Sequence, residues 1–198
     1  MDPRFTVRVR TVLEDDTSKM ELQIVQFFNQ LGQGTIIDAI TIIINYIPLL
    51  IILWFVLGVI SLRFDKKKGR LVFLSIIVAT LIYFIVSDFI LKTFIVEFFG
   101  IKLRPYLVDP ESIKPLGFKF VDSSFPSGHV SSTTAVLAVF VFYYKKYWLP
   151  AILFTLFMAF ARMHMGMHFP SDVLFGFIFG LIYAIFGIKI AKWILRRR

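Results

Sequence analysis

The sequence predicts an all-α membrane protein, with a bundle of about five transmembrane helices after an N-terminal amphipathic segment in the membrane interface. Of its 198 residues, 58% are apolar, more than a soluble domain of this size can bury. The apolar residues form long runs instead of one-sided stripes, as is typical of transmembrane helices. The chain has no cysteine, which excludes disulfides, a thiolate nucleophile and a Cys-ligated zinc site.

The first 19 residues differ from the rest of the chain. They are polar, carry four acids and four bases, and lack the apolar core of a signal peptide. We interpret residues 1–19 as a non-native leader or a disordered tail. Residues 20–198 are then a single membrane-embedded domain.

Leu22–Tyr46 comes next and mixes Gln, Asn and Asp38 with Ile, Phe and Leu. This composition favours an amphipathic segment that lies in the interface, and a poorly hydrophobic sixth span is the alternative. Five apolar runs follow, each near the ~20 residues that cross a bilayer, although several are short. They are Ile47–Leu62, Leu71–Phe94, Val130–Tyr144, Trp148–Met163 and Val173–Ile190.

Basic residues predict the orientation of these spans. They cluster in the 63–70 loop, at Lys145 and Lys146, and in residues 189–198. These three places alternate so that they share one membrane face, which the positive-inside rule makes cytoplasmic. The 100–126 loop and the 164–171 turn then lie on the outer face. Because the net charge of +9 concentrates at one membrane face, it does not indicate a nucleic-acid partner.

Three polar clusters lie at the outer ends of the predicted spans. One is Lys92 with Arg104-Pro105, the second is Pro126-Ser127-Gly128-His129, and the third contains Arg162, His168 and Asp172. A charge in or near the membrane is costly, so each cluster is a candidate functional site.

The second cluster has the features of an anion site. Ser127 and Gly128 directly precede the apolar run from Val130, so they occupy the N-terminal end of a helix, where free N–H groups and the helix dipole favour an anion. Glycine lets a phosphate approach the backbone closely. His129 follows at the same rim.

The third cluster has the features of a nucleophile with its orienting group. Asp172 follows His168 by four residues across a helix start, so it can accept the imidazole N–H and raise the nucleophilicity of the other nitrogen. Arg104 and Arg162 offer planar forks to phosphate oxygens. Two histidines, two arginines and a helix N-terminus on one membrane face predict a phosphoryl-transfer site.

Other interpretations of these residues remain open. Asp172 could only cap its helix. His164, His168 and Asp172 have the spacing of a metal-binding helix face, but Gly166 and Pro170 interrupt the helix that this requires. We expect His164 to be a packing residue. Gly176 and Gly180 form a small-xxx-small pair, which predicts close helix packing.

From about Glu21 to its end the sequence resembles the type 2 phosphatidic acid phosphatase superfamily, whose motifs are Lys-x6-Arg-Pro, Pro-Ser-Gly-His and Ser-Arg-x5-His-x3-Asp. The second motif matches in full, and the third has Ala161 in place of serine. The resemblance implies that His168 is the nucleophile, Asp172 its orienting group and His129 the acid that protonates the leaving group. It assigns phosphate binding to Arg104, Arg162, Ser127 and the Gly128 amide, and it implies no metal or other cofactor.

The first motif departs from the family pattern. Glu97 stands where the lysine is usual, and Lys92 lies five residues earlier. An insertion slightly longer than one helical turn keeps Lys92 on a similar face, and Asp88 could steady it. We expect Lys92 to bind phosphate. Lys102 is the competing candidate, and the last possibility is that neither lysine does so.

By this resemblance the protein is a metal-independent phosphatase of the cytoplasmic membrane, with its site facing the periplasm and a phosphohistidine intermediate. Candidate substrates are lipid A 1-phosphate, which we favour, phosphatidylglycerol phosphate and undecaprenyl diphosphate. Its expected partners are thus an anionic phospholipid, a prenyl diphosphate or lipid A, and membrane lipid. A metal-dependent hydrolase and an anion channel or carrier are the alternatives from other classes.

Overall fold

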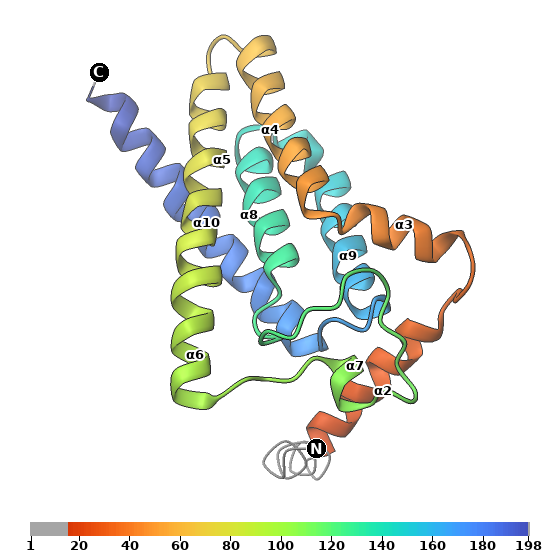
Figure 1. Ribbon diagram of the computed structural model, residues 1–198. Helices are drawn as coiled ribbons and strands as arrows, with labels where there is room; N and C mark the ends of the chain where they lie inside the picture. Colours follow the sequence, from red (N-terminus) through yellow and green to blue (C-terminus); the bar gives the residue numbers. More distant parts are fainter. Residues whose placement is uncertain (1–15, 198) are drawn as a thin grey trace.

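A computed structural model describes residues 16–197, apart from the side chains of Lys92, Ile95, Val96 and Phe99. Within this range all regular structure is helical, as the sequence predicts. The helices form a bundle, and the first two helices lie near one end of it (Figure 1).

Among residues 16–197, three helical stretches are long and apolar enough to cross a membrane. They are α4 (Ile47–Phe64), the continuous stretch Gly69–Leu91, and α10 (Pro170–Arg196). The middle stretch consists of α5 (Gly69–Tyr83) and the π-helical η1 (Phe84–Leu91), and α6 (Lys92–Phe99) continues it. The two other predicted spans are shorter helices, α8 (Gly128–Tyr143) with 16 residues and α9 (Trp148–His164) with 17.

Glycines allow α10 to pack closely against α8 and α5. A Cβ atom at Gly176 would lie 2.8 Å from the Ser127 carbonyl oxygen, and one at Gly180 would lie 2.5 Å from Thr134 Cβ. A Cβ atom at Gly187 would lie 2.8 Å from the Cβ atom of Ala79 on α5. The predicted packing role of Gly176 and Gly180 is therefore confirmed.

The expected amphipathic N-terminal segment contains two helices. Helix α2 (Asp16–Gln30) includes the last four residues of the expected leader or tail, whose residues 1–15 lie outside the described part of the structure, and α3 (Ile36–Ile44) follows it. Gly32 and Gly34 between them have φ of 70° and 76°, a conformation that glycine adopts easily and that ends α2. Thr35 then caps α3 by accepting the Ile37 N–H.

One end of the bundle holds the longest connection between the helices (Figure 1). It holds α7 (Pro105–Val108), the long segment from α7 to the start of α8, and the turn from α9 to α10. The opposite end holds the α4–α5 connection and η2 (Lys145–Tyr147). All three polar motifs therefore lie at or near the same end of the bundle, as the alternation of the spans predicts.

Candidate active site

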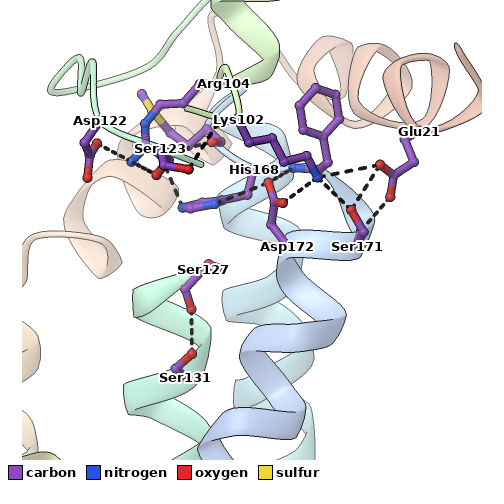
Figure 2. A network of polar contacts seen from close by, with 12 residues as sticks. Glu21, Lys102, Arg104, Asp122, Ser123, Ser127, Ser131, His168, Ser171 and Asp172 are labelled. Atoms are coloured by element: carbon purple, nitrogen blue, oxygen red, sulfur yellow. Dashed lines mark hydrogen bonds and ion pairs between the residues drawn. The ribbon is translucent and has the colours of Figure 1, made fainter. Parts of the chain in front are cut away.

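A pocket at this end brings residues of the three clusters together. Helices α4, α5, η1, α8 and α9, the segment 104–127 and the turn before α10 all contribute to it. Its lining comprises Ile47, Tyr83, Asp88, Arg104, Phe120, Asp122, Pro126, Gly128, His129, Arg162 and His168. Part of the polar network around the pocket is drawn in Figure 2.

His168 is held in a defined tautomer. It lies in the turn between α9 and α10 and is 3% exposed. Its Nε2 atom is 3.4 Å from Nη1 of Arg104, and because a guanidinium can only donate, Nε2 must carry the lone pair. The imidazole proton is then on Nδ1, which is 3.8 Å from Oδ2 of Asp172. This distance exceeds a hydrogen bond, but catalytic contacts are often long before substrate binds.

The Asp172 carboxylate has defined partners on both of its oxygens. Oδ2 accepts the Phe169 N–H at 2.9 Å, and Oδ1 accepts from Lys102 Nζ at 2.7 Å. Asp172 is the third residue of α10 and thus caps this helix. Asp172 can cap α10 and also orient His168, because its Oδ2 atom lies toward both the Phe169 N–H and Nδ1 of His168. The orienting role stays a prediction.

His129 is the second residue of α8, and its ring is anchored on one side. Nε2 lies 2.9 Å from the backbone oxygen of Asn45. A carbonyl oxygen can only accept, so Nε2 carries a proton. The other nitrogen, Nδ1, is left to exchange a proton with a ligand, as a general acid requires.

Both arginines are almost fully buried. Arg104 donates to Asp122 Oδ1 at 2.6 Å and to the Met167 carbonyl at 3.1 Å. Arg162 donates to Asn45 Oδ1 at 3.1 Å. The Nε atoms of both arginines and the Ser127 hydroxyl are buried without a hydrogen-bond partner among the residues that the structure describes. Such groups are costly unless a ligand satisfies them, and phosphate oxygens can do so.

Gly128 allows α8 to begin close to α5. A Cβ atom at this position would lie 2.6 Å from the Tyr83 hydroxyl, closer than any side chain tolerates. The Ser127 N–H donates to the Asp172 carbonyl at 3.0 Å, which ties the start of α8 to the start of α10. The helix N-terminus predicted from the sequence is therefore beside the His168–Asp172 pair.

Burial lowers the pKa of His168 to about 3. Asp172 opposes this shift, and the charges of Arg162 and Arg104 add to it. The imidazole is consequently neutral at physiological pH, which is the form that a nucleophile needs.

The two candidate lysines are not equally described. Lys102 Nζ binds Asp172 Oδ1 and the Ser171 hydroxyl, at 2.7 and 2.9 Å. The side chain of Lys92 lies outside the described part of the structure. Phosphate binding by either lysine therefore stays a prediction.

His164 has the expected packing role. It is fully buried and stacked on Phe160, with Nε2 2.8 Å from the Leu31 carbonyl and Nδ1 3.2 Å from the Thr41 hydroxyl. Gly166, at φ 68°, separates α9 from α10. Among the described residues, no group of three or more His, Asp or Glu side chains is arranged to hold a metal ion.

Sequence reasoning missed three polar groups of the site. Asn45 holds both His129 and Arg162, Asp122 pairs with Arg104, and Glu21 contacts the start of α10. Asp88 was noted only as a partner for Lys92, although it lines the pocket. An acid inside an apolar run is itself a signal for a functional site. Asn45 and Asp122 carry no such signal.

The three polar clusters lie in a part of the chain that is similar to a known protein family. Residues 68–196, which contain all three polar clusters, match the PAP2 superfamily. The chain belongs to this superfamily. With its apolar helices and its membrane relatives, it is an integral membrane protein of the PAP2 type.

Two curated relatives of this PAP2 protein are lipid A 1-phosphatases. The one from Rhizobium johnstonii is 27% identical over 127 residues, 63% of this chain and 52% of the relative. The one from Rhizobium etli is 31% identical over 99 residues, 44% of this chain and 43% of the relative. The chain thus spans about half the length of the curated relatives it matches.

Two solved structures share the fold. LpxE from Aquifex aeolicus is 25% identical, with a TM-score of 0.63 over 85% of this chain and 94% of that one. A transmembrane PAP2-type phosphatidylglycerolphosphate phosphatase from Bacillus subtilis is 21% identical, with a TM-score of 0.66 over 98% of this chain and 95% of that one.

Proposed function

We propose that this PAP2 protein hydrolyses a phosphate monoester or diphosphate of a membrane lipid, through a phosphohistidine intermediate and without a metal. The observation that carries the proposal is a neutral, buried imidazole beside two buried arginines whose Nε atoms have no partner in the described structure. This arrangement supplies a nucleophile and preorganised positive charge at one point.

In the first step the lone pair on Nε2 of His168 attacks phosphorus, and the bond from phosphorus to the lipid oxygen breaks. With substrate bound, His129 carries a second proton on Nδ1 and gives it to that oxygen, so the lipid leaves as an alcohol or, from a diphosphate, as a monophosphate. The positive charge on the phosphorylated imidazole is offset by Asp172 next to Nδ1.

In the second step water attacks the phosphohistidine. His129, now neutral, takes a proton from this water through Nδ1, and the bond from phosphorus to Nε2 breaks. Inorganic phosphate leaves and His168 regains its lone pair. Arg104, Arg162 and Ser127 hold the phosphate oxygens in both steps.

An apolar groove supports a lipid as the substrate. It runs between α4 and α5, and its lining on α4 follows a helical stripe: Ile47, Leu50, Ile51, Trp54, Phe55 and Gly58. Ile47, Tyr83, Asp88 and His129 line both the groove and the phosphate pocket. A phosphate held by the arginines can therefore carry an acyl or prenyl chain that lies in the groove.

Among lipid phosphates we favour the 1-phosphate of lipid A, because both curated relatives are lipid A 1-phosphatases. Phosphatidylglycerol phosphate and undecaprenyl diphosphate are the other candidates. We also propose that the protein lies in the cytoplasmic membrane with the pocket facing the periplasm, as its basic residues indicate.

The first test uses the purified protein with a panel of these three lipids in excess chelator. We expect phosphate release to persist, and a rapid quench with a labelled substrate to trap the label on the protein. His168→Ala should abolish both phosphate release and labelling while the protein stays folded. Turnover without an adduct, together with near-normal activity of His168→Ala, would exclude the nucleophile assignment.

The second test concerns the groove. Ile51→Trp fills the groove, whereas Leu53→Trp adds the same side chain to α4 outside its lining. We expect Ile51→Trp to raise KM for a long-chain lipid phosphate about tenfold and to leave a short-chain phosphate nearly unaffected. The control variant Leu53→Trp should leave KM unchanged for both substrates. Equal effects of Ile51→Trp on both substrates would exclude chain binding in this groove.

A further inference from the structure

The N-terminal helix α2 contacts the start of α10 through one carboxylate. Glu21 Oε1 accepts the Ser171 N–H at 2.7 Å, and Oε2 accepts the Ser171 hydroxyl at 3.0 Å. The Glu21 side chain is only 17% exposed. Ser171 is the second residue of α10, so Glu21 satisfies an N–H group that has no partner within the helix.

Lys102 closes this network on the other side (Figure 2). Its ammonium group donates to the Ser171 hydroxyl and to Asp172 Oδ1, and it lies 3.9 Å from Glu21 Oε2. The same group lies 4.8 Å from the centroid of the Phe169 ring. Two hydrogen bonds, an ion pair with Glu21 and a ring contact therefore hold the ammonium group of Lys102 in one place.

These contacts determine where the Asp172 carboxylate lies. Lys102 and the Phe169 N–H hold its two oxygens, and Oδ2 is the oxygen beside Nδ1 of His168. Glu21 and Asp172 place two negative charges at the positive end of α10, and Lys102 compensates one of them. Without the Glu21 carboxylate, the N–H and the hydroxyl of Ser171 each lose their acceptor, and Lys102 keeps, among the described residues, only the Asp172 carboxylate as an ionic partner.

We propose that Glu21 is a positioning residue for the His168–Asp172 pair and acts on it through Ser171 and Lys102. The proposal rests on the role proposed above for His168. Glu21 precedes residues 68–196, which match the superfamily. The N-terminal amphipathic helix α2 is in this way part of the active-site structure as well as a segment that packs on the bundle.

A matched pair of variants on α2 tests this proposal. Gln26 also joins α2 to the bundle, since its Nε2 donates to Asp109 Oδ2 at 2.7 Å, away from Asp172. We expect Glu21→Ala to lower kcat about tenfold, because the nucleophile is less well aligned. KM and the inhibition constant of inorganic phosphate should stay within about twofold, since the arginines are untouched. Gln26→Ala should change none of the three.

Two further variants distinguish positioning from a purely structural contact. Glu21→Gln keeps an acceptor for the Ser171 N–H, so it should recover part of the kcat that Glu21→Ala loses. Lys102→Ala should also lower kcat, and Glu21→Ala/Lys102→Ala should be no slower than the slower single variant. The losses in kcat from the two single variants should not multiply, because Glu21 and Lys102 both act through Asp172.

Several outcomes would overturn the proposal. For Glu21→Ala, they are an unchanged kcat, with or without a raised inhibition constant for phosphate. For the other single variants, they are a loss of kcat in Gln26→Ala equal to that in Glu21→Ala, or no recovery of kcat in Glu21→Gln. For the double variant, the contradicting outcome is that the two losses in kcat multiply. His168→Ala is measured in the same assay. If it retains activity, the proposed mechanism fails; if it is inactive while Glu21→Ala is normal, only the role of Glu21 fails.

Discussion

The two ring nitrogens of His168 have opposite surroundings, and this difference determines their chemistry. Arg104 lies beside Nε2 and can only donate to it, while Asp172 lies beside Nδ1 and can only accept when ionised. In the proposed mechanism the nucleophilic atom is therefore Nε2, the nitrogen that carries the lone pair. Burial and the charges of Arg162 and Arg104 lower the pKa of His168, so the imidazole is neutral when no substrate is bound.

The lowered pKa of His168 predicts an unusual response to an imidazole-acylating reagent, which attacks only the neutral ring. With a pKa of about 3, the neutral fraction stays near one as the pH falls from 7.5 to 5. An ordinary histidine, with a pKa near 6.5, loses about 30-fold in neutral fraction over the same range. We expect the acylation rate of His168, corrected for reagent decay, to change less than about twofold.

Mass spectrometry of the peptide that carries His168 measures this rate at each pH, and fragmentation separates it from His164. Inorganic phosphate should slow the reaction. A decline of about 30-fold toward pH 5 would mean that burial and the arginines do not lower the pKa.

The residues of the site differ in how far the sequence could predict them. His168 and Asp172 are four residues apart, so a helix start brings them together by local geometry alone. His129 and Asn45 are 84 residues apart, and Ser171 and Glu21 are 150 apart. Those contacts depend on how α2 and α3 pack against the bundle, which no local pattern determines.

At the scale of the elements, apolar runs predicted the helices, with the starts of α4 at Ile47 and of α9 at Trp148, but not the starts of α8 and α10. The structure begins α8 at Gly128 and α10 at Pro170, two and three residues before the expected runs. The residues in between are polar because they belong to the site, and hydropathy does not count them as part of a span. The glycine turn within the N-terminal segment and the π-helical η1 were also missed, since an apolar run carries no signal for either.

The contact between the start of α8 and α5 predicts a compensating pair of variants. In Gly128→Ala the new Cβ atom would lie 2.6 Å from the Tyr83 hydroxyl, but 3.5 Å from the ring carbon that bears it. We expect Gly128→Ala to lower kcat/KM by about 10²-fold, because it shifts the N-terminus of α8 that we propose to bind the phosphate.

Tyr83→Phe removes the clashing atom, so the double variant Gly128→Ala/Tyr83→Phe should recover at least tenfold over Gly128→Ala. Phosphate release under kcat/KM conditions is the measurement, and Tyr83→Phe alone is the reference. If the double variant is as impaired as Gly128→Ala, the hydroxyl is not what requires glycine at this position.

Across the whole molecule, chemistry and charge are separated between the two ends of the bundle. The segment from α7 to α8 and the turn before α10, which contribute to the pocket, share one end, while the α4–α5 connection, η2 and the C-terminal part of α10 lie toward the other (Figure 1). Basic side chains at the second end lie over aromatic rings, with Lys192 Nζ 4.7 Å from Phe142 and Arg197 Cζ 3.9 Å from Trp193. Such basic and aromatic pairs are typical of a membrane interface.

This separation predicts which end faces the cytoplasm. Lys67, between α4 and α5, and Lys114, between α7 and α8, are both exposed and lie at opposite ends. The chain contains no cysteine, so Lys67→Cys and Lys114→Cys each introduce a single thiol. By the positive-inside rule, a thiol reagent that cannot cross the cytoplasmic membrane should label Lys114→Cys in intact cells and leave Lys67→Cys unlabelled. After lysis in detergent both should react equally, which controls for local accessibility. The reverse pattern in intact cells would place the pocket in the cytoplasm and restrict its substrates to lipids of the inner leaflet.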